Sequence, residues 1–213
     1  MKRFSSIIDK SDLERYFSDT RPKSPLTQSY NIDVLDCCNM LIASDGFMLE
    51  AKWGASPASD DLTMPFIDFR QVHVKPTFRM SFRTQRSIVI ADSFYAWKSS
   101  ERKPIRISLE NGLMFFPAIY FKIADGSFGF TIMTRSARKS LRNFCDVEPV
   151  IFNQQAAFEW LDFLPVAQVI KLLQTTLPVP FRNHVVSQKI LVKGFNGKVL
   201  HEKQQEQQPL LFN

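Results

Sequence analysis

Apolar and polar residues alternate with a period of two through the middle of the chain, a pattern typical of half-buried β-strands. The runs Met40–Ala43 and Phe47–Lys52 flank Ser44-Asp45-Gly46, and together they predict a β-hairpin. Two further strands are predicted at Ser87–Ala91 and Phe128–Thr134.

A second hairpin is expected further along the chain. Ile105–Leu109 and Met114–Tyr120 both alternate, and Glu110-Asn111-Gly112 between them contains an Asn-Gly pair. That pair is a strong signal for a tight turn between antiparallel strands. The polar segment Asp60–Pro65 is expected to be a loop.

Helical periodicity appears on both sides of this strand-rich region. Ser11 is expected to cap a helix, with Glu14 completing a capping box and Leu13, Tyr16 and Phe17 on the apolar face. Three further helices are predicted at Ser136–Phe144, Gln154–Leu161 and Val166–Thr175. The pattern therefore predicts the α+β class, with a strand-rich centre and peripheral helices.

Length and composition favour one folded unit followed by a tail. A chain of 213 residues fits a single domain. Residues 1–200 are expected to form it, as a monomer. Residues 201–213 are rich in Gln, Glu and Lys, and we expect them to be a flexible tail.

The charge is positive and unevenly distributed. The formal charge is +6, and four basic residues without an acid lie between Arg135 and Arg142. From Arg79 to Arg106 there are seven Lys or Arg and two acids. Such clusters suit a polyanion such as nucleic acid, and a solvated surface is the alternative. The 20 phenylalanines are expected mainly in the core, with a few available to stack on bases.

Several classes of protein are disfavoured. Three cysteines, Cys37, Cys38 and Cys145, have no paired spacing, which argues against a disulfide framework and a zinc site. No phosphate-binding Gly loop is present, and we expect no cofactor or metal. The first residues lack an apolar signal core, and no apolar run approaches the roughly 20 residues of a membrane span. A cytoplasmic protein is expected.

Four collinear segments resemble one family. Trp53-Gly54-Ala55-Ser56-Pro57 resembles a Trp-Gly-x-x-Pro signature, and Arg86–Lys98 resembles a strand that runs into Gly-Phe/Trp-Tyr/Phe-Glu-Trp-Lys. Phe130–Thr134 resembles an Ile-Ile/Val-Thr strand, and Val186-Ser187 a C-terminal Val-Ser segment. On these segments, residues 1 to about 200 resemble the SOS-response-associated peptidase (SRAP) family, whose members form crosslinks with abasic DNA.

The resemblance implies a compact, barrel-like domain with a positively charged groove for single-stranded DNA, in the DNA-damage (SOS) response. It also implies a mechanism. A cysteine exposed by Met removal attacks the ring-opened abasic sugar, its amine forming a Schiff base and its thiolate closing a thiazolidine. An Asn positions the sugar, while a Glu and a His assist with proton transfer.

All four of these positions differ here. Met1 occupies the cysteine register, followed by Lys2, whose bulk favours retention of the methionine. The Asn, Glu and His are matched by Asp68, Ala96 and Cys145. An amine without the thiol cannot close a thiazolidine, so loss of the family reaction is expected. Cys145 is either a displaced nucleophile or a buried, inert thiol.

Other family residues are retained and are candidates for DNA contact. Arg70 could bind phosphate or form a surface salt bridge. The full set of predicted DNA contacts is Arg3, Phe4, Trp53, Arg70, Arg86 and Lys98.

The end of the chain resembles the short Gln-x-x-Leu-Phe peptide with which bacterial repair proteins dock on the sliding clamp. Gln208, Leu210, Leu211 and Phe212 are the predicted contacts. An apolar pair in a polar tail can enter a pocket on a partner. The alternative is that this end folds back on the domain.

Three functions follow from the sequence. The favoured one is a protein that binds single-stranded or abasic DNA without forming the family's crosslink. The second is an altered enzyme, in which the amine of Met1 or Lys2 forms a Schiff base with an abasic site. The third is a clamp-interacting protein with a degenerate groove.

Overall fold

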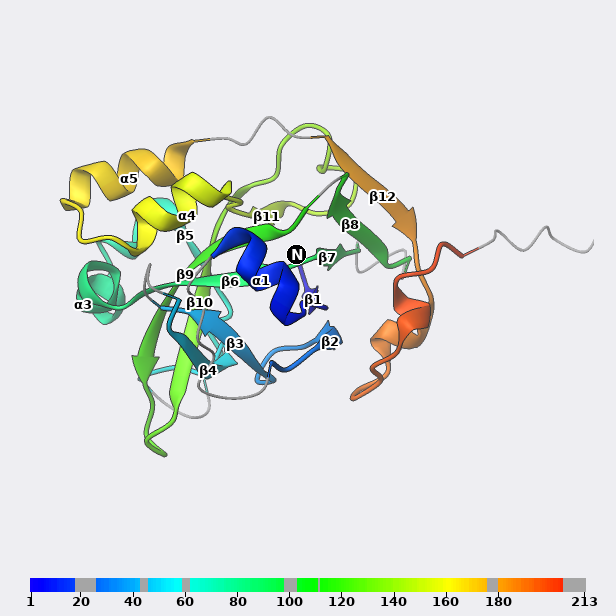
Figure 1. Cartoon of the computed structure of the whole chain (residues 1–213), viewed down its shortest axis with the longest axis horizontal. Helices are drawn as coiled ribbons and strands as arrows, with labels where there is room; N and C mark the ends of the chain where they lie inside the picture. Colours follow the sequence, from blue (N-terminus) through cyan, green and yellow to red (C-terminus); the bar gives the residue numbers. More distant parts are fainter. Residues whose placement is uncertain are drawn as a thin grey trace, which may run out of the picture.

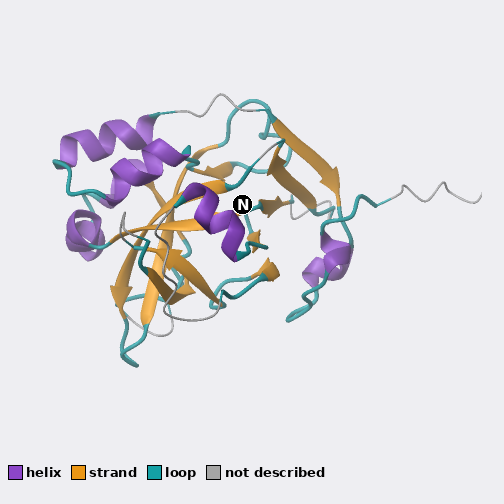
Figure 2. Cartoon of the chain, viewed as in Figure 1, coloured by secondary structure: helices purple, strands orange, loops and turns teal. Residues whose placement is uncertain are grey.

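The computed structural model describes residues 1–17, 26–42, 46–58, 62–97, 103–110, 112–175 and 180–204 (Figures 1 and 2). The strands within these ranges are β1 (Arg3–Ser6), β2 (Ser29–Ile32), β3 (Cys37–Leu41), β4 (Met48–Trp53), β5 (Phe66–Asp68), β6 (Arg86–Ala91), β7 (Ser93–Ala96), β8 (Ile105–Leu109), β9 (Met114–Lys122), β10 (Phe128–Ser136), β11 (Val147–Pro149) and β12 (Phe181–Val185). The helices are α1 (Lys10–Tyr16), α2 (Phe69–Val72), α3 (Pro76–Thr84), α4 (Gln154–Leu161) and α5 (Val166–Gln174), with short 3-10 turns η1 (Gln188–Leu191) and η2 (Lys198–Leu200).

The strands form a closed ring and a second sheet beside it. In the ring, β10 pairs with β4, β4 with β3, β3 with β6, β6 with β9, and β9 again with β10. Strands β5 and β11 also pair with β10. The second sheet has the order β12-β8-β7-β1-β2. The predicted α+β class and the barrel-like centre are confirmed.

Strand β6 connects the two main cores, because its side chains alternate between them. Ile88 and Ile90 lie in a cluster that includes buried residues of α1, α3, α4 and α5. Val89 and Ala91 lie in a second cluster with Phe4 of β1 and other residues of the second sheet. In Figure 1, α3, α4 and α5 gather at one end of the molecule, and the segment with η1 and η2 lies at the opposite end.

Of the two predicted hairpins, one is confirmed and one is wrong. Strands β3 and β4 pair antiparallel, with Met40 opposite Leu49. Strands β8 and β9 do not pair with each other. β8 lies between β7 and β12, whereas β9 lies between β6 and β10. Gly112 has a left-handed φ of 96°, so the chain does turn there, but the turn connects two different sheets.

The predicted helix at Gln154–Leu161 is confirmed, and that at Val166–Thr175 is confirmed to within one residue. The helix predicted at Ser136–Phe144 is wrong. β10 continues through Ser136, and residues 139–144 then form turns. The buried carboxylate of Glu148 accepts hydrogen bonds from the backbone N–H of Arg138 at 3.0 Å and from its Nε at 2.9 Å. This interaction ties the segment to β11 in place of a helix.

Helix α1 exists but starts earlier than predicted. Its capping box joins Asp9 and Asp12, since Asp9 accepts from the Asp12 N–H at 2.8 Å and Asp12 accepts from the Asp9 N–H. Ser11 and Glu14 are inside the helix, where Glu14 pairs with Lys10 at 3.4 Å. An Asp at this position competes well with Ser as a cap.

A third, smaller core anchors the end of the described chain. Tyr95 of β7 is fully buried with Val186, Ile190 and Leu200, and its hydroxyl donates to the carbonyl of Tyr30 at 2.9 Å. The residues after β12 are therefore packed on the second sheet as far as η2. Within the described residues, no helix is long and apolar enough to cross a membrane.

Candidate functional site

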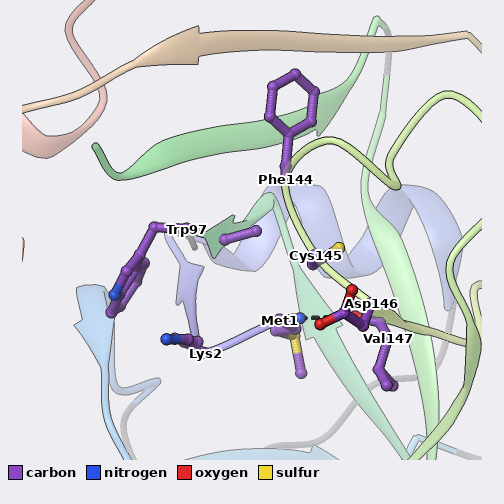
Figure 3. Close-up of a pocket in the computed structure, with 8 residues that line it drawn as sticks. Met1, Lys2, Trp97, Phe144, Cys145, Asp146 and Val147 are labelled. Carbon is purple, nitrogen blue, oxygen red and sulfur yellow. Dashed lines mark hydrogen bonds between the residues drawn. The ribbon is translucent and has the colours of Figure 1, made fainter. Parts of the chain in front are cut away.

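A cavity of about 470 Å³ opens beside the N-terminus, and we call it the N-terminal pocket (Figure 3). Three segments meet there, because β1 pairs with β7 and the chain before β11 folds over their ends. The lining residues are Met1, Lys2, Ala96, Trp97, Phe144, Cys145, Asp146 and Val147. The pocket thus brings together three of the four family catalytic positions, along with Lys2.

The N-terminal amine is the reactive group best placed in this pocket. It donates to the carbonyl of Val147 at 2.8 Å, and the Met1 side chain is buried in the second core (Figure 3). Burial lowers the pKa of the amine below its ordinary value of 8.0, and the nearby Lys2 charge acts in the same direction. Cys145 and Glu148 oppose that shift. A lowered pKa increases the neutral fraction of the amine, which is the nucleophilic form.

Cys145 is a protonated thiol in the wall of the same pocket. Burial raises its pKa, although the N-terminal amine opposes that shift. The thiol donates to the carbonyl of Leu141 at 3.8 Å, and the residue is half-buried. Of the two predicted alternatives, the structure therefore excludes a fully buried position and gives no sign of an activated thiolate.

Lys2 and Trp97 flank the mouth of the pocket. The Lys2 ammonium lies 5.1 Å from the centre of the Trp97 ring, within cation–π range. Trp97 is half-buried and packs against the third core, so it serves as an anchor that also presents a face to the pocket. The Arg86–Lys98 motif included Ala96 and Trp97, and the family comparison pointed to Cys145, but neither indicated Phe144, Asp146 or Val147 in the lining.

Ala96 and Asp68 do not supply the chemistry of the family residues they replace. The methyl group of Ala96 is fully buried and cannot transfer a proton. Asp68 is outside the pocket lining and caps α2 by accepting from the N–H of Arg70 at 2.9 Å. It also forms a two-point salt bridge with the Arg70 guanidinium, and that hydrogen bonding lowers the pKa of Asp68. Asp68 is thus ionised and paired, while the Arg70 side chain remains 65% exposed.

Three predicted DNA contacts are interior residues, which corrects their assignment. Phe4 and Trp53 have no exposed surface and pack edge to face at 5.0 Å. Arg86 is 7% exposed, and its Nε donates to the carbonyl of Trp160 at 2.7 Å. Other nitrogens of Arg86 donate to carbonyls of Phe82, Arg83 and Asp162. These side chains are part of the scaffold, and their burial leaves almost no surface for DNA.

Arg3 is also engaged within the protein. Its guanidinium forms a salt bridge with Asp33 at 2.6 Å and donates to the carbonyl of Ile190, which ties β1 to η1. The three arginines of the 135–142 cluster are likewise engaged, since Arg135 donates to the carbonyl of Leu173, Arg138 pairs with Glu148, and the Nε of Arg142 donates to the carbonyl of Ala137 at 3.0 Å. The exposed basic residues of that cluster are Lys139 and Arg142, which precede the pocket residue Phe144.

Five predicted residues cannot be placed. They lie outside the residues that the structure describes: Lys98, Gln208, Leu210, Leu211 and Phe212.

A second polar cluster occupies the other end of the β1–β7 pair and had no clear signal in the sequence. Asp92 accepts hydrogen bonds from Ser5 at 3.0 Å, Ser93 at 3.2 Å and Arg106 at 2.9 Å. His201 approaches Asp92 at 3.4 Å, and burial lowers the pKa of His201 to about 4, so the ring is neutral. Ser5 meets Asp92 directly, without a histidine between them, so this is no catalytic triad.

No group of three or more His, Cys, Asp or Glu in the described ranges could hold a metal ion.

Comparison with known proteins agrees with the motifs and the fold. The family model described as SOS response associated peptidase (SRAP) matches residues 2–192. Abasic site processing protein YoaM of Bacillus subtilis is 32% identical over 176 residues, covering 75% of each chain. Abasic site processing protein YoqW of Bacillus phage SPbeta is 28% identical over 176 residues, covering 75% of this chain and 76% of that one.

Solved structures show the same fold at low sequence identity. A protein from Bacteroides thetaiotaomicron gives a TM-score of 0.80 at 17% identity, covering 96% of this chain and 100% of that one. A protein from Bordetella bronchiseptica gives a TM-score of 0.74 at 16% identity, covering 88% of this chain and 100% of that one. The motifs, the fold and the family match lead to one conclusion: the chain belongs to the SRAP family.

Proposed function

We propose that this protein recognises abasic sites in single-stranded DNA and takes the ring-opened sugar into the N-terminal pocket. One observation carries the proposal: a cavity of about 470 Å³ contains a buried amine whose pKa is lowered. A ring-opened abasic sugar carries an aldehyde, and a neutral amine is its natural partner. The names of the relatives YoaM and YoqW, abasic site processing proteins, support the same substrate.

The proposed function differs from the crosslinking that the family resemblance implies. Met1 carries a thioether where that reaction uses a thiol, so no thiazolidine can close on this residue. Ala96 offers no acid or base, and Asp68 is occupied by Arg70. We therefore infer that non-covalent contacts hold the DNA and bring the sugar beside the Met1 amine.

The DNA backbone is proposed to run past exposed basic side chains near the pocket. Lys139 and Arg142 are on the segment that also carries Phe144 and Cys145, and Lys2 is at the pocket mouth. Arg70 is a further candidate, since its side chain stays exposed while paired with Asp68. Each phosphate contact would make affinity fall with salt.

Binding measurements on three matched single-stranded oligonucleotides test the proposal. One carries a single abasic site, one a tetrahydrofuran analogue without an aldehyde, and one is intact. We expect the tightest binding to the abasic strand. Replacing both Lys139 and Arg142 by Gln should make the plot of log binding constant against log salt concentration less steep. The expected change in slope is about 1.4, because each lost phosphate contact on a single strand contributes roughly 0.7. Equal affinity for all three strands would reject abasic recognition.

A second candidate, Schiff-base chemistry, is favoured by the state of the Met1 amine. The Lys2 side chain carries the other amine at the pocket, but it is exposed and lies over the Trp97 ring. Met1 is buried and anchored by Val147, so the two amines differ in environment. We propose Met1 as the nucleophile, and borohydride trapping of the imine followed by peptide mapping identifies the residue.

A further inference from the structure

Two groups that are far apart in the sequence, the Met1 amine and the Cys145 thiol, line the same cavity. The Met1 amine is held by the carbonyl of Val147, only two residues beyond Cys145. The Cys145 thiol interacts with the amine, and each group shifts the pKa of the other. One short segment therefore positions both an amine and a thiol around the space that a bound aldehyde would occupy.

We propose that Cys145 captures the imine formed at Met1 and closes an N,S-acetal, in which one sugar carbon is bonded to both the Met1 nitrogen and the Cys145 sulfur. This inference rests on the proposed function. It assigns a catalytic role to Cys145. The amine and the thiol then come from two residues that are distant in the sequence, whereas the family reaction takes both from one cysteine.

The steps balance without a cofactor or an oxidant. The amine adds to the aldehyde carbon, and loss of one water gives the C=N bond of the imine. The thiol then adds across that bond, so that sulfur bonds to carbon and the thiol proton passes to nitrogen. Each step is reversible, and the product keeps all atoms of the imine and the thiol.

The protonated state of Cys145 suits this reaction. Addition to an imine requires a proton on nitrogen. The thiol supplies that proton, and the thiolate that it leaves is the nucleophile that attacks the carbon. This matters because Ala96 cannot donate one and Asp68 is not in the lining. Holding the two groups in one cavity also replaces an encounter in solution by a reaction within a single complex.

The chain contains a matched control for this thiol. Cys37 of β3 is exposed and does not line the pocket, so it cannot reach an imine at Met1. Cys38 is fully buried, and burial raises its thiol pKa above the ordinary range. Cys37→Ser should leave the reaction unchanged, whereas Cys145→Ser should stop it at the imine.

The test uses the full chain and a single-stranded oligonucleotide whose abasic C1′ carbon is labelled with ¹³C. Intact mass first establishes that the protein used begins with Met1 and has a free amine. In the wild type and in C37S, we expect a C1′ resonance typical of an sp³ carbon bonded to nitrogen and sulfur. In C145S, the resonance should shift to that of an sp² imine carbon, and borohydride should trap the adduct faster.

Iodoacetamide labelling gives an independent readout that tolerates a weakened C145S fold. Addition of abasic DNA to the wild type should protect Cys145 from alkylation and leave Cys37 reactive, while the tetrahydrofuran strand should protect neither. An sp² imine signal in the wild type with an unprotected Cys145 would overturn the inference and leave the proposed function standing. Abasic-strand binding with no adduct at all would overturn both this inference and the Schiff-base chemistry, whereas loss of abasic preference would reject the proposed function itself.

Discussion

The two ends of the β1–β7 pair are built from adjacent residues and yet differ sharply. At one end, Asp92 accepts from Ser5, Ser93 and Arg106, and from the N–H of Ile7 at 3.0 Å. We call this the closed end. At the other, which we call the open end, the Met1 amine donates to one carbonyl beside a cavity.

The difference shows where reactivity can reside in this fold. At the closed end, Asp92 and its four donors satisfy one another, so their polarity stabilises the folded chain. At the open end, the amine and the thiol each have a backbone carbonyl as partner, and both also line a cavity that a ligand could enter. A polar cluster alone is therefore a poor guide to chemistry here, and the groups beside the cavity are the better candidates.

The largest expected effect is at the open end. Acetylation of the Met1 amine delocalises its lone pair into an amide, which is not nucleophilic, so borohydride-trapped adduct on abasic DNA should fall to background. In the unmodified protein, the rate of trapping should rise with pH around a midpoint below 8.0, because burial lowers the pKa of the amine. The measurement is gel quantification of adduct across pH.

Lys2→Gln is the control for that experiment. It should retain trapping because the Met1 amine is still present, although the pH midpoint should rise because the Lys2 charge that lowers the pKa of the amine is gone. If the adduct mapped to Lys2, or if Lys2→Gln abolished it while acetylation did not, Met1 would be the wrong nucleophile.

The next largest effect is expected at the closed end and on stability. Asp92→Ala leaves Arg106 and two serines without their acceptor, and we expect a loss of about 3 kcal/mol in the free energy of unfolding. Chemical denaturation measures it. Adduct formation per folded molecule should stay unchanged, since Asp92 is not in the pocket lining.

Glu14→Gln provides the comparison for an exposed pair. Its partner Lys10 is on the surface of α1, and removal should cost less than about 0.5 kcal/mol. If Asp92→Ala lowered the free energy of unfolding no more than Glu14→Gln does, or if it abolished trapping, the two ends would not differ in function as we propose.

Acid should loosen the closed end through His201. Its pKa in the folded chain is about 4, below the ordinary 6.5, so the unfolded chain binds the extra proton between those values. Stability from neutral His201 is therefore full above pH 6.5 and is lost as pH falls toward 4. Asp92 favours the charged ring, whereas Arg106 and His184 oppose it.

Hydrogen exchange of the segment 186–204 measures this effect, with β6 as an internal reference. We expect protection of the segment to fall relative to β6 between pH 7 and pH 5. A His201→Gln variant should lack most of that dependence. The same fall in the variant would show that another group is responsible.

The smallest effect on the pocket is expected from the tail. Deleting residues 208–213 should leave abasic-DNA binding and trapping unchanged, because the described pocket is built without them. Binding to a purified bacterial sliding clamp should be lost, as measured by surface plasmon resonance. Unchanged clamp affinity, or no affinity in the full chain, would remove the proposed clamp role.

Local patterns predicted elements well where neighbours in sequence are also neighbours in space. β3 and β4 followed their alternation, and α4 followed its helical period. The hairpin predicted for residues 105–120 is wrong because a turn signal indicates only that the chain reverses direction. It does not indicate which strands then pair. Each strand found partners elsewhere, such as Tyr95 opposite Arg106 and Ile88 opposite Pro117.

Family motifs located the site more reliably than they assigned roles. They placed Met1, Ala96 and Cys145 together, but burial and pairing of individual side chains are long-range properties. Arg86 illustrates this, because it carries a charge in a basic stretch and yet donates to four carbonyls inside the protein. The sequence also gave no signal that the carbonyl of Val147 anchors the amine.

That anchor has a consequence for how the protein is made. Met1 and the carbonyl that holds its amine are 146 residues apart in the chain. A nascent chain that ends before β11 lacks the carbonyl that holds the amine, so the N-terminal pocket is complete only after residue 147 has been synthesised. A purification tag fused ahead of Met1 would convert its amine into a peptide nitrogen beside the cavity. Such tags therefore belong at the other end of the chain.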